Sequence, residues 1–158
     1  MSSLLLLALA IGIGVIAGLR SLTAPAVVGW AAHLRWITIP NAHLALLGTR
    51  WVVLALSLLA IVELVIDKLP STPNRTAPGP MIGRLLTGGL SGAALCAAAD
   101  QSVFVGAILG GIGALLGTFG GFHLRSRLVK IVGAPDVFIA LIEDAVAIGG
   151  AFLLVSRL

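Results

Sequence analysis

The chain has 158 residues, of which 59% are hydrophobic and 10% charged, and its formal net charge is +4. A soluble domain carries roughly 25% charged residues, and a domain of this size has too little interior to bury so much apolar surface, so a soluble globular protein is excluded. Excess Lys and Arg are typical of the flanks of membrane spans, and because no basic residues alternate with aromatic ones here, nucleic acid is excluded as a partner.

Five apolar segments follow one another along the chain. A helix needs about 20 mainly apolar residues to cross a bilayer. The sequence therefore predicts an all-α polytopic membrane protein, a single transmembrane domain over 1–158, with spans at about 1–19, 51–66, 81–99, 101–122 and 137–155. The first segment lacks the positive n-region of a signal peptide, so we expect it to remain in the mature protein.

The segment from Leu22 to Ile39 does not fit the pattern of a simple span. It contains Pro25, His33 and Arg35, and its apolar stretch is too short to cross alone. It is either a re-entrant or interfacial helix, which we expect, or a sixth span. Irregular backbone at membrane depth has to be shielded by protein or line a watery cavity.

The basic residues of the connections predict the orientation. Loops with more Lys and Arg remain in the cytoplasm. With five or with six spans, the connections at 67–84 and 123–136 face the cytoplasm of a bacterial inner membrane. Five spans place the N-terminus in the cytoplasm, and six place it outside.

Small residues recur three or four positions apart in several spans, most densely in the fourth. Glycines at this spacing let helix backbones approach closely. They predict tight packing inside one subunit, with a dimer seam as the alternative, and we also expect a homo-oligomer because five short spans enclose little space. The glycines of the fourth span are Gly106, Gly110, Gly113, Gly117 and Gly121.

Two short matches suggest an internal repeat. The letters GLRS at 18–21 are similar to HLRS at 123–126, and AIVE at 60–63 is similar to ALIE at 140–143. With five spans, the related helices would run in opposite directions. The matches thus predict an inverted repeat, an arrangement found in many secondary transporters.

Charged residues inside the apolar segments are the candidate site. Glu63 and Asp67 are four residues apart and share a helix face, while Glu143 and Asp144 lie within the last span. A charge at membrane depth costs about 2.5–3.5 kcal/mol, so these groups have to pair, protonate or meet water. The predicted site residues are Glu63, Asp67, Glu143, Asp144, Arg20, His123 and Arg125, with Lys68, Arg75, Arg84 and Arg127 as a second group.

Three interpretations of this set remain open. In the first, the carboxylates line a polar path; in the second, Arg20 and Arg125 form buried salt bridges to Glu143 and Glu63. In the third, the carboxylates and His123 hold a divalent cation, but no ligand spacing points to it, and the metal stays unknown. We expect no cofactor.

Four motifs together carry a resemblance. They are GLRS…P at 18–25, E…DKLPSTPNR at 63–75, His123 with Arg127, and IED at 142–144. With them the chain resembles an uncharacterised family of small bacterial integral membrane proteins, catalogued only as a domain of unknown function. The resemblance implies that the charged positions form one coherent set, and it implies no particular activity.

The sequence leads to two functional hypotheses. The first is a small inner-membrane transporter or channel for a small ion or charged solute, not an enzyme, because charged residues inside membranes usually mark function. The alternative is a non-transporting structural or lipid-binding protein whose charges form salt bridges. Membrane lipid is an expected partner in both cases.

Overall fold

The computed structural model describes residues 3–68, 76–133 and 135–158. Within these ranges the chain forms helices and turns and no strand, which confirms the all-helical prediction. The helices are α1 (Ser3–Leu19), α2 (Thr23–His33), α3 (Ala42–Ala45), the 3-10 turn η1 (Leu46–Gly48), α4 (Arg50–Ile66), α5 (Pro78–Ala98), α6 (Val103–Val132) and α7 (Asp136–Val155).

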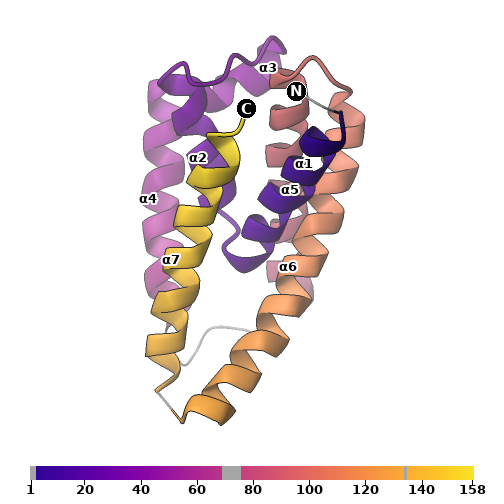
Figure 1. The fold of residues 1–158 in the computed structure, drawn as a ribbon. Helices are drawn as coiled ribbons and strands as arrows, with labels where there is room; N and C mark the ends of the chain where they lie inside the picture. The colour runs from indigo at the N-terminus through magenta and orange to yellow at the C-terminus, as the bar shows by residue number, and fades with distance from the viewer. Residues whose placement is uncertain (1–2, 69–75, 134) are drawn as a thin grey trace.

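The chain runs up and down a bundle, and its two ends lie together (Figure 1). We call this the upper end of the molecule; Ser3, Trp36, Asp100 and Leu158 line one cavity of about 380 Å³ there. An odd number of crossings would place the two ends on opposite sides of a membrane. The five-span arrangement is therefore not confirmed.

Three helices, α5, α6 and α7, are long and apolar enough to cross a membrane. Together, α3, η1 and α4 form a fourth candidate, which is bent by 62° where η1 meets α4. Helix α1, with 17 residues, is shorter. The three to four candidate spans in the described part of the chain are consistent with a multi-pass membrane protein.

Helices α1 and α2 form a hairpin that enters the bundle from the upper end and turns back inside it (Figure 1). Helix α2 has 11 residues, a length of about 16 Å, which is too short to cross a bilayer. The turn between the helices consists of Arg20, Ser21 and Leu22, and we call it the hairpin tip. The segment 22–39, which did not fit a simple span, is thus the returning arm of this hairpin.

The core is a glycine seam where α1, α5 and α6 meet. A Cβ atom built on Gly110 would lie 2.1 Å from the backbone oxygen of Gly88, and one built on Gly14 would lie 2.1 Å from that of Gly110. Backbones this close leave no space for any side chain. The glycines therefore pack inside one subunit, as the favoured interpretation predicted.

The seam also gives the relative direction of α1 and α6. Gly113 of α6 packs against the backbone oxygen of Ile11 in α1. Gly117 packs against that of Val15, which lies one turn further along α1, as Gly117 does along α6. The two helices are therefore parallel. Because the inverted repeat requires the first and fourth predicted spans to be antiparallel, that repeat is not confirmed.

Candidate functional site

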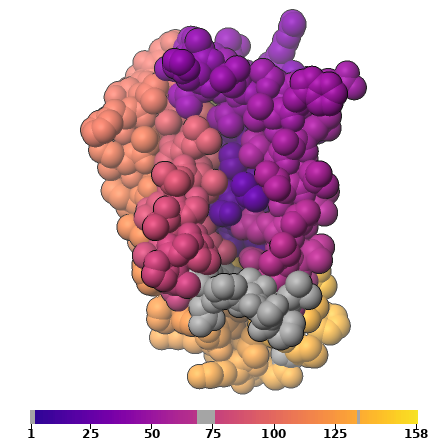
Figure 2. Space-filling model, turned by 180° about the vertical axis from the view of Figure 1, so that it is seen from behind, coloured from indigo at the N-terminus to yellow at the C-terminus, as the bar shows by residue number. Residues whose placement is uncertain are grey.

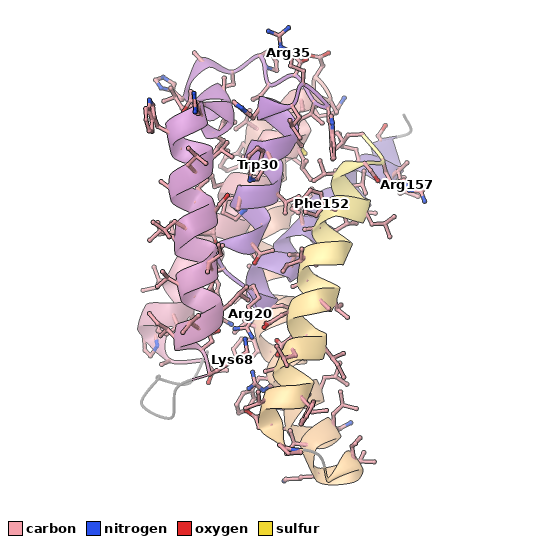
Figure 3. The ribbon with its side chains drawn as sticks, turned by 90° about the vertical axis from the view of Figure 1, so that its left-hand side faces the viewer. Arg20, Trp30, Arg35, Lys68, Phe152 and Arg157 are labelled. Carbon is pink, nitrogen blue, oxygen red and sulfur yellow. The ribbon has the colours of Figure 1, made fainter. Side chains whose placement is uncertain are left out.

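Six charged side chains gather around the hairpin tip, and we call them the charge cluster. They come from the tip itself, from the lower end of α4, from the second turn of α5 and from the middle of α7. Figure 3 shows Arg20 and Lys68 close together on the inner side of α7. The members are Arg20, Glu63, Asp67, Lys68, Arg84 and Asp144.

Arg20 lies at the centre of the cluster and is completely buried. Its Nη1 donates a hydrogen bond to Asp67 Oδ2, and its Nη2 lies 2.5 Å from Asp144 Oδ1. The second contact is an ion pair without hydrogen-bond alignment, and Nε has no hydrogen-bond partner among the described residues. One guanidinium thus ties the hairpin tip to both α4 and α7, with part of its donor capacity unused.

Two further cations complete the surroundings of the two aspartates. Lys68 Nζ donates to Asp144 Oδ2 at 2.6 Å and to the Leu64 carbonyl at 2.8 Å. Arg84 Nη1 donates to the Gly18 carbonyl at 2.9 Å, and its Nη2 lies 3.7 Å from Asp67 Oδ2. Each aspartate therefore faces two cations, and Arg84 also holds the last turn of α1.

Glu63 binds the hairpin tip in a different way. Its Oε1 accepts from the backbone N–H of Ser21 at 2.7 Å, and its Oε2 accepts from that of Leu22 at 2.8 Å. No side chain caps α2 from within its own N-terminal turn. Glu63 provides this cap from α4, and its negative charge lies at the positive end of the α2 dipole.

Among the described residues, the cluster contains three cations and three carboxylates, so its formal charges sum to zero. Arg20, Arg84 and Asp144 are buried, whereas the side chains of Asp67 and Lys68 are 18% and 22% exposed. The cluster is thus closed toward the glycine seam and partly open at the lower end of α4. Such an arrangement can hold the hairpin in place, and it can exchange a charged partner on its open side.

The remaining predicted residues lie apart from the cluster. Arg125 donates to both oxygens of Asp136, at 2.9 and 2.5 Å, and approaches Glu143 at 3.5 Å. His123 is exposed and bonds to the Phe119 carbonyl of its own helix at 2.7 Å. Arg127 is exposed, and Arg75 lies outside the described residues.

The salt bridges differ from the predicted ones. The expected pairs were Arg20 with Glu143 and Arg125 with Glu63, whereas Arg20 pairs with the two aspartates and Arg125 with Asp136 and Glu143. Neighbouring residues on a helix point about 100° apart, so Asp144 faces the tip while Glu143 faces Arg125. Spacing alone does not distinguish between these two carboxylates.

A metal site is not supported in the described part of the chain. No three His, Cys, Asp or Glu side chains come together there in a way that could hold an ion. The carboxylates of the charge cluster instead face Arg and Lys side chains and backbone amides. These donors occupy the positions that a cation would need.

Sequence reasoning underestimated Arg84 and Lys68. Arg84 is buried, although it was placed in the second group, and Lys68 pairs with Asp144 across the bundle. The signal was present for Arg84, because it is a lone charge in the second turn of an otherwise uncharged helix. Such a residue has to find a partner at membrane depth.

Replacing Lys68 by Met should weaken the cluster moderately. Asp144 loses one charged hydrogen bond but keeps Arg20, so we expect the free energy of unfolding to fall by about 1–2 kcal/mol. Thermal unfolding in detergent, followed by tryptophan fluorescence, measures the change. Lys130→Met, at an exposed position of α6, is the control; equal stability of the two variants would contradict a role of Lys68 in the cluster.

Comparison with known proteins gives one family. A family model described as "Domain of unknown function (DUF4126)" matches residues 7–156, a range that contains the whole charge cluster. No curated protein and no solved structure matches the chain.

Proposed function

The chain belongs to this family of domains of unknown function, and from that premise we propose that it is a small transporter that moves a charged solute past the hairpin tip. The charge cluster acts as the gate of this path. One observation carries the proposal: a helix too short to cross the bilayer begins at the hairpin tip, among six charged groups, of which one belongs to the tip and five come from α4, α5 and α7. Broken helices whose ends point at charged groups are typical of the sites of secondary transporters.

The charge cluster resembles a closed gate in its bonding. Paired charges hold the hairpin tip against α4, α5 and α7, so a path along the hairpin stays shut while the pairs persist. Buried ion pairs contribute little net stability compared with apolar side chains of the same size. Keeping six charges at this point is therefore better explained by a state that opens than by stability alone.

The proposed path of the solute follows a furrow on one face of the molecule. Figure 2 shows it between α4 and α5, with the N-terminal part of the chain visible at its floor. The glycine seam leaves no passage between α1, α5 and α6. We propose that the solute moves along the hairpin side of the bundle, and that a second copy of the chain encloses this side in a homo-oligomer.

The charge distribution supports an orientation in a bacterial inner membrane. Arg125, Arg127 and Lys130 lie near the lower end of α6, and loops rich in basic residues remain in the cytoplasm. Trp36 and Trp51 are 55% and 79% exposed near the upper end, where an interfacial belt is expected. We propose that the lower end of the bundle faces the cytoplasm and that both chain ends lie on the opposite side of the membrane. In this arrangement the hairpin of α1 and α2 enters the membrane from that opposite side and returns to it.

A second candidate function rests on the partners that each member of the charge cluster already has. Every member of the charge cluster has at least one oppositely charged or hydrogen-bonding partner. A structural or lipid-binding membrane protein would need no more than this. In that case the cluster stays dry and shut under all conditions.

Thiol labelling separates the two candidates. In a Cys96→Ala background, we place single cysteines at Ser21 in the tip, at Ser126 on the exposed lower part of α6 and at Thr38 near the upper end. An impermeant maleimide should reach Ser126→Cys from the cytoplasmic side only and Thr38→Cys from the outside only. For a transporter, Ser21→Cys should react from each side in turn. If folded protein is labelled at Ser21→Cys from neither side, the structural candidate replaces transport.

A further inference from the structure

We propose that the hairpin tip is a binding site for a small organic carboxylate, and that Glu63 occupies it in the present state as an attached substitute. A solute carboxylate takes its place when Glu63 carries a proton and leaves. This inference rests on the proposed transport function, for which it names the substrate class and the coupling ion.

The contacts of Glu63 are those of a carboxylate-binding site. Its two oxygens each accept one hydrogen bond, from the consecutive amides of Ser21 and Leu22, at 2.7 and 2.8 Å. The carboxylate comes from another helix, more than 40 residues away along the chain. Backbone amides at a helix N-terminus bind any carboxylate of suitable shape, so nothing in these two bonds requires Glu63 itself.

Arg20 gives an independent indication that the site accepts a further anion. Arg20 comes directly before these two amides in the chain, and its side chain is 0% exposed. Within residues 3–68, 76–133 and 135–158, its Nε has no hydrogen-bond partner, and its Nη2, which pairs with Asp144, is not aligned for a hydrogen bond. Buried guanidinium donors normally find acceptors. An arriving anion at the tip brings oxygen atoms that can satisfy these donors.

Among the three carboxylates of the cluster, Glu63 is the one that a solute can replace. Asp67 and Asp144 each face two cations, whereas the partners of Glu63 in the described part of the chain are neutral backbone amides. Its side chain is half-buried and lies one helical turn before Asp67, the partly exposed edge of the cluster. Release of Glu63 thus leaves all pairs of Arg20 intact.

The charge of the cluster then determines the coupling. With Glu63 ionised, the three cations and three carboxylates sum to zero. Protonation and departure of Glu63 leave a charge of +1, and one monocarboxylate restores neutrality. A cation in the same place would raise the charge to +2, which is costly at membrane depth. One proton on Glu63 therefore accompanies one monocarboxylate, and the joint movement carries no net charge.

Chemical rescue tests the binding site. We expect Glu63→Ala to lower the unfolding temperature of the protein in detergent. Acetate or formate should restore at least half of the loss, compared with chloride at equal ionic strength. Glu63→Gln still fills the site and should gain nothing from acetate. Asp136→Ala, which removes an exposed carboxylate from Arg125, is the matched control and should also gain nothing. If acetate does not stabilise Glu63→Ala beyond these controls, the inference is overturned.

Flux in proteoliposomes tests the coupling with the wild-type protein, so it does not depend on the folding of any variant. We expect a lactate or gluconate gradient to drive proton uptake, measured with an enclosed pH dye, at a rate that a clamped membrane potential does not change. Flux of sodium or choline without carboxylate flux would overturn the inference and leave transport standing. Rescue by acetate without flux of any of these solutes would overturn the proposed transport, and the coupling with it.

Discussion

Replacement of Arg20 by Met should lower the free energy of unfolding by about 3–5 kcal/mol, because it leaves two carboxylates without their shared cation. Arg20 is completely buried between Asp67 and Asp144, and Met fills a similar volume without the charge. Asp144 keeps Lys68 and Asp67 keeps Arg84 only at 3.7 Å, so neither is fully compensated. Unfolding of the purified protein, by heat or by a denaturing detergent, measures the loss.

Two comparisons separate the ion pairs from a general effect of removing an arginine. Arg127→Met, on the exposed part of α6, should change stability by less than about 0.5 kcal/mol. The double variant Arg20→Met with Asp144→Asn should recover part of the loss, because one of the abandoned charges is then absent. If Arg20→Met is as stable as Arg127→Met, the charge cluster does not hold the hairpin.

Gly110→Ala should be strongly disruptive for a single added carbon, with a loss of about 3 kcal/mol or more. The new methyl group would lie 2.1 Å from the Gly88 carbonyl oxygen and 3.2 Å from the Gly92 Cα, so α5 and α6 would have to separate along the seam. Overpacking of a rigid core costs about 1–3 kcal/mol. Because the new methyl group would clash with the backbone of α5 and not with a flexible side chain, we expect a loss of stability at or above the upper end of this range. The unfolding temperature in detergent is the measurement.

The next residue provides a matched control for this prediction. A Cβ on Gly111 would meet nothing within 4 Å, and Ala is a better helix former than Gly by up to about 1 kcal/mol. Gly111→Ala should therefore be neutral or slightly stabilising, in the same helix and with the same chemical change. Similar losses for the two variants would show that the seam is less tight than these distances indicate.

The helices can be predicted from the sequence because a bilayer sets simple requirements for a spanning helix. A span needs length and apolar composition, and long uncharged stretches such as 101–122 satisfy both without reference to partners. The glycine spacing likewise predicted close packing inside the subunit. Features that depend on a single helix can therefore be predicted from the sequence. One of them is the shared helix face of Glu63 and Asp67, which both bind the hairpin tip.

The arrangement of the helices was not accessible in the same way. Whether 22–39 crosses or turns back depends on what covers the tip, and the covering groups come from α4, α5 and α7. The inverted repeat is not confirmed for a related reason, because GLRS and HLRS lie on two helices that run parallel. Short matches between apolar segments reflect their similar composition, whereas the relative direction of two helices is determined by how the whole bundle packs.

The position of the two chain ends has a consequence for protein engineering. Because Ser3 and Leu158 line the same cavity at the upper end of the bundle, a short linker at that end can join Leu158 of one copy to Ser3 of another. A tandem fusion of two copies is therefore feasible without an added helix. Such a fusion, with Arg20→Met in one half only, would show whether the activity of one subunit depends on the charge cluster of the other.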